Sequence, residues 1–199
     1  MEGLRTSPAW PGVTARGLRD TLKGMRTAYI GMGGNVASKV GTAEATLAAA
    51  ALRLESLGRV VARSSLYSTA PVGFHEQPRF VNAVIALATE LSPRELLDEL
   101  MKIEQEFGRD RAASFANGPR TLDLDILLFG DLIVTEPGLE IPHPRLAERA
   151  FVLIPLDEIA ADVRVPGCGR SVAQLQASLL DGSKNEADAV MRMECDGWK

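Results

Sequence analysis

A stretch that is apolar on both faces, Phe80–Thr89, places the strongest constraint on the fold. Its sequence, FVNAVIALAT, is typical of a central strand, because such a strand is covered on both sides of its sheet. Asn82 is the one polar interruption. A buried amide needs hydrogen-bond partners, which either the protein backbone or a polar, planar ligand can supply.

Strand and helix patterns alternate on either side of this stretch. Alternating apolar and polar residues predict strands, whereas apolar residues spaced three and four apart predict helices. In chain order these patterns give a strand at 27–32, a tight glycine turn at 33–35, a helix at 40–57, a strand at 59–67, the central strand, a helix at 92–108 and a strand at 118–130. The second helix is marked by a capping box, with Ser92 as N-cap, Pro93 at the first helical position and Glu95 at the third.

The order βαββαβ predicts an α+β protein with a ferredoxin-like fold, in which helices pack on an antiparallel sheet. A C-terminal hairpin and helices are expected to follow it. The turn residues Gly130-Asp131 and Pro137-Gly138 predict the hairpin. The remaining patterns predict a helix at 145–161 interrupted by Pro155, a short edge strand at 163–165 and a helix at 171–180.

We expect one domain, at 27–182, between a disordered N-terminal extension at 1–26 and a flexible C-terminal tail at 183–199. The net charge of −4 argues against a general nucleic-acid binder. No apolar run reaches the length of about eighteen residues that a membrane span needs, and the N-terminus lacks a secretory pattern. Cys168 and Cys195 fit no metal or redox spacing, which predicts free thiols in a cytoplasmic protein.

The last strand, GPRTLDLDILLFG at 118–130, carries two carboxylates on one face. The alternation places Leu122, Leu124, Ile126 and Leu128 on a core face, and Thr121, Asp123, Asp125, Leu127 and Phe129 on the other. Two acids about 6–7 Å apart repel each other and are costly to desolvate, unless a cation lies between them. Hard oxygen ligands at this spacing suit Mg²⁺, and pairs of such ions serve phosphoryl chemistry. The alternative is a solvent-facing Asp-x-Asp at a strand end.

Arg109, Arg111 and Arg120 precede or begin this strand, in a long irregular segment at 109–120. Guanidinium groups bind phosphate bidentately, so the segment predicts a lid over a polyphosphate, or else an ordinary surface loop. Glu104 lies beside the apolar stripe of the preceding helix, where it is either a rim charge or the partner of an arginine. His143 is fixed between two prolines, and either contacts phosphate or has a structural role.

Five motifs in this chain resemble the 6-hydroxymethyl-7,8-dihydropterin pyrophosphokinase family of folate biosynthesis. They are YIGMGGN at 29–35, YSTAPVGFHEQPRFVNAV at 67–84, IEQEFGR at 103–109, GPRTLDLDILLFG at 118–130 and IPHPRLAERAFVLIPLDEIA at 141–160. The resemblance implies that residues 27–182 are a pyrophosphokinase domain. Such a domain moves the β,γ-diphosphate of ATP to the pterin hydroxymethyl oxygen and releases AMP. It also implies the use of ATP, the pterin and two Mg²⁺ ions. We further expect a monomer without nucleic-acid or membrane partners.

The resemblance further implies roles for individual residues. Asp123 and Asp125 would hold the metal ions and act in catalysis with Arg109 and Arg120. The pterin would be bound by Thr69, Val72, Phe80, Asn82 and Phe151. ATP and its phosphates would be bound by Arg109, Arg111, Arg120, Ile126, His143 and Arg149. Glu104 would be a supporting residue.

Three positions depart from the pattern of the family. Phe115-Ala116-Asn117 stands where a Trp is familiar, Phe80 replaces a Tyr, and Pro144 replaces a Tyr found in some members. Two other functions remain open, a non-catalytic ligand-binding module and a metal-dependent phosphohydrolase. The first predicts that the two acids are dispensable, and the second that water suffices as acceptor.

Overall fold

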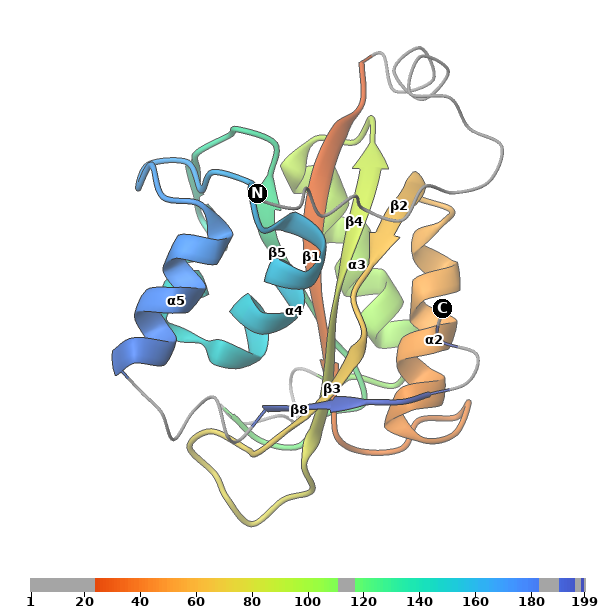
Figure 1. The fold of residues 1–199 in the computed structure, drawn as a ribbon. Helices are drawn as coiled ribbons and strands as arrows, with labels where there is room; N and C mark the ends of the chain where they lie inside the picture. Colours follow the sequence, from red (N-terminus) through yellow and green to blue (C-terminus); the bar gives the residue numbers. More distant parts are fainter. Residues whose placement is uncertain (1–23, 111–116, 183–189, 196–197, 199) are drawn as a thin grey trace.

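The computed structural model describes residues 24–110, 117–182, 190–195 and 198, and Figure 1 shows their arrangement. Six strands form one antiparallel sheet in the order β5-β1-β4-β3-β8, and β2 also pairs with β4. Their bounds are β1 Arg26–Gly34, β2 Arg59–Arg63, β3 Leu66–Thr69, β4 Phe80–Thr89, β5 Asp123–Phe129 and β8 Val190–Met193. The predicted central strand is therefore β4, and the ferredoxin-like order βαββαβ is confirmed, with β2 and β3 in place of its second strand.

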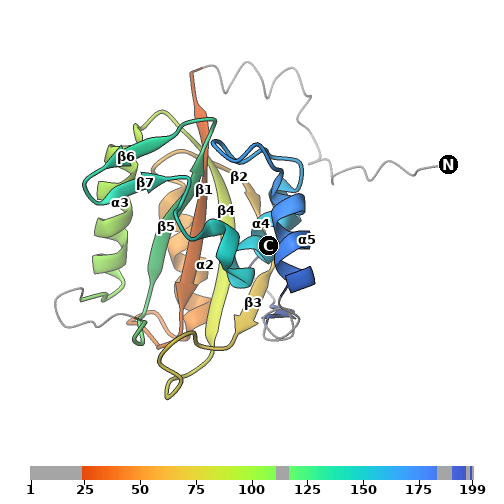
Figure 2. The ribbon, with the colours of Figure 1, turned by 90° about the vertical axis from the view of Figure 1, so that its left-hand side faces the viewer.

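Helices cover both faces of this sheet, which gives three layers. The helices are α2 Ala43–Leu54, α3 Pro93–Glu106, α4 Ala150–Ala160 and α5 Val172–Gly182, with a short 3₁₀ helix η1 at Leu146–Glu148. Figures 1 and 2 show α2 and α3 on one face and α4 and α5 on the other. Because β4 faces a helical layer on each side, both of its faces are apolar.

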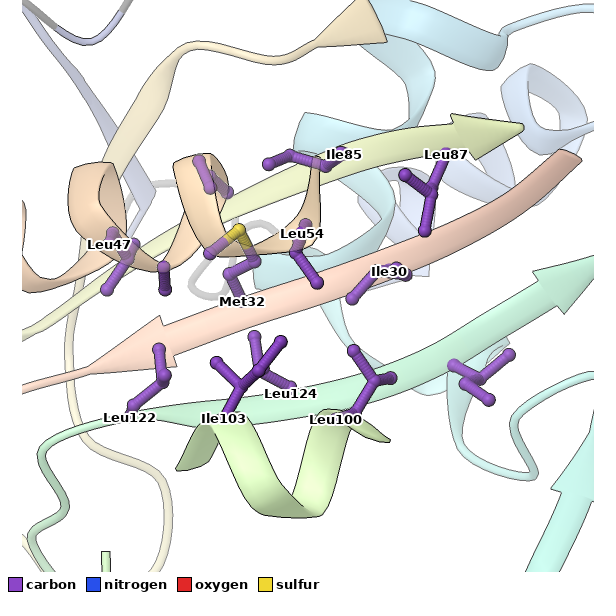
Figure 3. Packing of buried hydrophobic residues seen from close by; sticks show 14 of the residues in the cluster. Ile30, Met32, Leu47, Leu54, Ile85, Leu87, Leu100, Ile103, Leu122 and Leu124 are labelled. Atoms are coloured by element: carbon purple, nitrogen blue, oxygen red, sulfur yellow. The ribbon is translucent and has the colours of Figure 1, made fainter. Parts of the chain in front are cut away.

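The larger core lies between the sheet and the α2–α3 layer. Figure 3 shows side chains of both helices meeting side chains of β1 and β4 and the residues at the start of β5. Its labelled residues are Ile30, Met32, Leu47, Leu54, Ile85, Leu87, Leu100, Ile103, Leu122 and Leu124. A second cluster on the opposite face joins α4 and α5 to the sheet through residues that include Val84, Leu127, Leu153 and Val172.

The predicted capping box starts α3. The backbone N–H of Ser92 donates to Glu95 Oε2 at 2.8 Å, and the backbone N–H of Glu95 donates to Ser92 Oγ at 3.3 Å. The first helix starts later than expected, at Ala43, because Thr42 is its N-cap and accepts from the N–H of Ala45.

The expected strand at 59–67 is two strands, β2 and β3, separated at Ser64 and Ser65. The hydroxyl of Ser64 accepts from the N–H of Val84 at 2.9 Å, so a side chain takes part in the ladder at the break. The hairpin also differs from expectation, because β6 Val134–Glu136 and β7 Leu139–Ile141 pair only with each other, around Pro137-Gly138. Only an isolated bridge, from Arg164 to Ser171, stands where an edge strand was expected at 163–165.

A bulge in β5 reverses the faces that were predicted for Leu128 and Phe129 at the end of the strand. Tyr29 pairs with Leu128 and Ile30 with Ile126, so Leu127 has no partner on β1. Leu128 therefore belongs to the α4–α5 cluster and Phe129 to the α2–α3 cluster, the reverse of the alternation predicted from sequence. Asp123 and Asp125 precede the bulge.

The C-terminal region contains structure where a flexible tail was expected. Residues 190–193 form β8 against β3, and Trp198 is buried with 2% of its surface exposed. Residues 1–23 of the expected extension at 1–26 lie outside the described residues, and Arg26 already belongs to β1. Within the described parts of the chain, no helix is long and apolar enough to cross a membrane.

Candidate active site

A cavity of about 330 Å³ opens where β1, β4 and β5 lie side by side. Its lining includes Thr69, Val72, Phe80, Asn82, Arg109, Arg120, Asp123, Asp125, His143, Arg149 and Phe151. These residues come from separate parts of the chain, and the fold brings them together as the sequence predicted. Ile126 instead lines a second cavity of about 330 Å³ that shares Asp125 and His143 with the first. Arg111 lies outside the described residues, and so do Phe115 and Ala116, which depart from the family pattern.

The two acids face glycines on the neighbouring strand. Asp123 pairs with Gly33 and Asp125 with Gly31, both within β1. A Cβ at Gly33 would lie 2.7 Å from Oδ1 of Asn82, so a larger residue would displace the amide. The sequence pattern predicted a tight turn at 33–35 for Gly33 and Gly34. That was wrong, because residues 33 and 34 continue the strand and glycine is needed there for close approach.

Asp123 is held between two guanidinium groups. Arg109 Nη1 donates to its Oδ1, and Arg120 Nη1 donates to its Oδ2 at 2.6 Å. Burial acts to raise the pKa of Asp123, but the charges and hydrogen bonds of the two arginines together outweigh it and keep that pKa below its ordinary value. Asp123 is therefore ionised at neutral pH.

Asp125 has the opposite environment. No hydrogen bond or ion pair joins its carboxylate to any other described residue. Burial, followed by the negative charge of Asp123, raises the pKa of Asp125 to about 6. Among the described residues, no group of three or more His, Cys, Asp or Glu side chains could hold a metal ion. The two carboxylates on β5 remain the candidate metal ligands that the sequence predicted.

Glu104 is the partner of an arginine rather than a rim charge. Only 1% of its surface is exposed, and its Oε1 accepts from Arg109 Nη1 at 2.6 Å and from the N–H of Leu124 at 2.8 Å. One carboxylate therefore fixes both an arginine of the cavity and the backbone of the acid strand. Arg109 Nε is buried without a hydrogen-bond partner.

Two aromatic rings and one amide form the less charged part of the cavity. Arg120 lies over the ring of Phe80 at 5.5 Å, and Arg149 lies over the ring of Phe151 at 5.6 Å. Asn82 Nδ2 donates to Thr69 Oγ1 at 2.8 Å. The buried amide on β4 thus has a protein partner for its nitrogen, while the residue lines the cavity.

His143 lies where the two cavities meet. The backbone N–H of His143 donates to the carbonyl of Leu127 at 2.9 Å. The ring atom Nδ1 accepts from the backbone N–H of Arg145 at 3.1 Å. Burial, then the charges of Arg149 and Arg145, lower the pKa of His143 to about 4. The ring is therefore neutral at pH 7, and the bond at Nδ1 assigns its proton to Nε2.

Asn35 is a connecting residue that the sequence reasoning assigned only to a turn. Its Oδ1 accepts from the N–H of Arg120 at 2.9 Å, and its Nδ2 donates to Gln77 Oε1 at 2.9 Å and to the carbonyl of Pro78 at 3.0 Å. Gln77 Nε2 in turn donates to the carbonyl of Asn117 at 2.7 Å. The strand–helix connection after β1 thereby joins the loop before β4 to the residues before β5. The only signal in the sequence was an Asn directly after two glycines.

Comparison with known proteins identifies the family. The model of the 7,8-dihydro-6-hydroxymethylpterin-pyrophosphokinase (HPPK) family matches residues 29–161. A curated relative named 2-amino-4-hydroxy-6-hydroxymethyldihydropteridine pyrophosphokinase, from Pseudomonas aeruginosa, is 47% identical over 150 residues, which cover 75% of this chain and 90% of that protein. The relative of the same name from Haemophilus influenzae is 46% identical over 142 residues, which cover 71% and 86%.

A solved structure supports the fold independently. The structure of wild-type HPPK-DHPS from Plasmodium falciparum matches with a TM-score of 0.69 at 14% identity, over 86% of this chain and 45% of that one. Because the identity is low, this match shows the fold alone. The sequence matches decide the family, and the chain belongs to the 7,8-dihydro-6-hydroxymethylpterin-pyrophosphokinase family.

Proposed function

We propose that this chain transfers the β,γ-diphosphate of ATP to the hydroxymethyl group of 6-hydroxymethyl-7,8-dihydropterin, giving the pterin diphosphate and AMP in folate biosynthesis. The family and the names of the curated relatives support this activity. The structural observation that carries it is a single cavity with two different ends. One end holds paired carboxylates and arginines, and the other holds two aromatic rings beside a buried amide.

The aromatic end suits a flat heterocycle. We infer that the pterin lies between Phe80 and Phe151, because aromatic faces favour a planar ring. Asn82 would bond the polar edge of the pterin, and its bond to Thr69 fixes the orientation of the amide. Val72, which is 56% exposed beside the cavity, can close over the ring when the pterin binds.

The charged end suits a polyphosphate. Arg109, Arg120 and Arg149 line it together with the neutral ring of His143, whose Nε2–H can donate to a phosphate oxygen. The unpartnered Nε of Arg109 is a further donor. Phosphoryl transfer depends mainly on in-line positioning and charge stabilisation, which these four side chains can supply from fixed positions. The role of Arg111 is proposed on the resemblance alone.

The acid pair fits Mg²⁺ by the chemistry of its donors. Asp123 and Asp125 offer hard oxygen ligands on one strand face, and Asp125, whose pKa is raised by burial and by Asp123, has no arginine bonded to it among the described residues. We infer that these two residues would hold two Mg²⁺ ions. When bound, the ions would neutralise the phosphates and lower the pKa of the attacking hydroxyl. Either carboxylate is then placed to accept the hydroxyl proton.

The second cavity is the proposed site of the adenosine. It is lined by Ile126, Leu97, Leu139 and Pro144 among others, and it meets the first cavity at Asp125 and His143. A nucleotide that lies in it would therefore direct its phosphates toward the acid pair.

We also propose a cytoplasmic monomer that binds neither nucleic acid nor membranes. The net charge of −4 argues against nucleic-acid binding, and the exposed thiol of Cys168 suits a reducing compartment. Size-exclusion chromatography with light scattering tests the oligomeric state.

Analysis of the nucleotide product tests the reaction. The protein is incubated with ATP, Mg²⁺ and 6-hydroxymethyl-7,8-dihydropterin, and AMP is separated from ADP. We expect AMP only when the pterin is present, and no AMP from Asp123→Ala. ADP and phosphate without pterin would instead support a hydrolase, and pterin binding without any product would support a binding module.

A further inference from the structure

The last strand of the sheet, β8, extends the strands that carry the proposed pterin residues. Figure 1 shows β8 beside β3, although the two strands come from opposite halves of the chain. Val190 pairs with Thr69, which pairs in turn with Phe80 on β4. Two rows further, Arg192 pairs with Tyr67, and Tyr67 pairs with Asn82 on β4. Each of these two rows therefore runs from β8 to a side chain of the proposed pterin site.

Side chains fasten β8 to the rest of the molecule. Arg192 Nε donates to Ser65 Oγ at 2.9 Å, and its Nη2 lies 3.6 Å from Oε1 of Glu158 on α4. Glu158 also accepts from the N–H of Ser65 at 2.7 Å and from the hydroxyl of Tyr67 at 3.0 Å. This network connects α4, which carries Phe151, with the short strand β3 and with β8.

Trp198 supplies a second attachment at the break between β2 and β3. Its side chain is buried, and Nε1 donates to the carbonyl of Ser64 at 2.6 Å. Arg63 lies over the indole ring at 5.9 Å. Ser64 in turn accepts from the N–H of Val84, a residue of β4 that lines the main cavity. The indole is thus one hydrogen-bonded residue away from the cavity wall.

Of the two proposed binding regions, β8 borders the pterin region and, among the described residues, does not border the adenosine cavity. Val190 lines a cavity of about 250 Å³ that shares Thr69, Val72 and Phe151 with the main cavity. The cavity proposed for adenosine is lined by none of the described residues of β8, nor by Trp198. β3 has only four residues, so without β8 it would be an edge strand held by β4 alone among the strands.

We infer that β8 and Trp198, which we call the C-terminal strap, hold β3 in the position that pterin binding requires. The strap lies outside residues 29–161 that the family model matches. It acts on Thr69, Phe80 and Asn82 through backbone pairing, so Arg192 and Trp198 are positioning residues for the pterin and not for ATP. This inference rests on the proposed function, because it takes the pterin as the ligand of the aromatic end.

Steady-state kinetics on the full chain tests the strap. Trp198→Phe keeps the ring but removes the Nε1 donor, and Arg192→Ala removes the bonds to Ser65 and Glu158. We expect each to raise KM for the pterin by about three- to tenfold, since the loss of one hydrogen bond to a fixed partner has effects of that order. KM for ATP should stay within about twofold, because the strap does not reach the adenosine cavity. Met191→Ala is the matched control, since Met191 lies on the same strand with 51% of its surface exposed.

A general loss of folding would give a different result. If KM for both substrates rises equally, or if both stay unchanged in Trp198→Phe and Arg192→Ala, the strap does not position the pterin. Circular dichroism confirms that each variant is folded at the assay temperature. Direct titration of the pterin, in the presence of an α,β-methylene analogue of ATP, gives the same comparison without turnover. An unsubstituted chain that binds pterin but forms no AMP would therefore overturn the proposed function while the titration still decides the strap.

Discussion

Arg120 donates from Nη1 to Oδ2 of Asp123 at 2.6 Å, so a proposed phosphate ligand and a proposed metal ligand bind each other. The same holds for Arg109, which donates to the other oxygen. Metal ions with ATP would replace the positive charge of the arginines at Asp123 and offer those arginines phosphate oxygens instead. The charge of Asp123 would thus be compensated both by the arginines and, when substrate binds, by the metal ions.

Arg120→Ala tests this exchange of partners. We expect kcat to fall by about 10²-fold, as for the loss of one donor that stabilises transferred charge. KM for the pterin should change by less than about threefold, because among the proposed pterin residues the change affects only Phe80, which loses a cation–π contact and keeps its ring. Stopped-flow or quenched-flow measurement of AMP formation separates the two parameters. A large loss of pterin affinity with kcat intact would place Arg120 at the pterin and not at the phosphates.

The two acids should respond in opposite directions to removal of their charge. Asp125→Asn should stabilise the metal-free protein by about 3 kcal/mol at pH 8, because burial and Asp123 raise the pKa of Asp125 to about 6. The ionised form is thus disfavoured by folding, and the gain should disappear as the pH falls below the ordinary pKa of about 4. Urea unfolding in EDTA measures both values.

Asp123→Asn is the matched comparison for that change. Its carboxylate is favoured by Arg109 and Arg120, so the amide should lower the free energy of unfolding in the same EDTA buffer. Both variants should lose diphosphate transfer, since each removes a proposed metal ligand. Two variants that are destabilised alike would show that the acids are not electrostatically distinct.

His143 should impose a measurable pH dependence on stability. Burial, Arg149 and Arg145 lower its pKa to about 4, against an ordinary value of about 6.5. Between pH 6.5 and 4 the unfolded chain binds a proton at His143 and the folded chain does not. The free energy of unfolding therefore has its full value above about pH 6.5 and falls as the pH drops toward 4. Asp125 has the opposite slope in this window, so the comparison is between the wild type and His143→Asn. The wild-type free energy of unfolding should fall more steeply from pH 6.5 to 4, and parallel curves would contradict the lowered pKa.

Local sequence patterns predicted those helices and strands whose buried faces and ends can be recognised from their own residues. The central strand is marked by apolar residues on both faces, and α3 is marked by a capping box within four residues of chain. The acid pair was predicted because Asp123 and Asp125 share a face over a single step of the alternation. These features need no knowledge of the partner strand.

Features that depend on distant partners were not predicted. The bulge at Leu127 exists only in the register with β1, and the break at Ser64 depends on the N–H of Val84. The role of Asn35 requires three loops to meet. Trp198 was assigned to a flexible tail, because a single buried aromatic residue in a polar segment has no periodicity. Non-local pairing, rather than propensity, fixes each of these residues.

Glu104 offers the sharpest test of how the site is positioned, because one oxygen serves two partners. Glu104→Gln keeps an acceptor for the N–H of Leu124 but removes the negative charge beside Arg109. We expect kcat to fall by about tenfold or more while KM for the pterin is retained, since Arg109 loses its fixed orientation and the aromatic end is untouched. Glu104→Leu, which in addition leaves the buried N–H of Leu124 without its acceptor, should lower the free energy of unfolding by about 1–3 kcal/mol. If Glu104→Gln has the kcat of the wild type, the buried carboxylate stabilises β5 without orienting Arg109 for transfer.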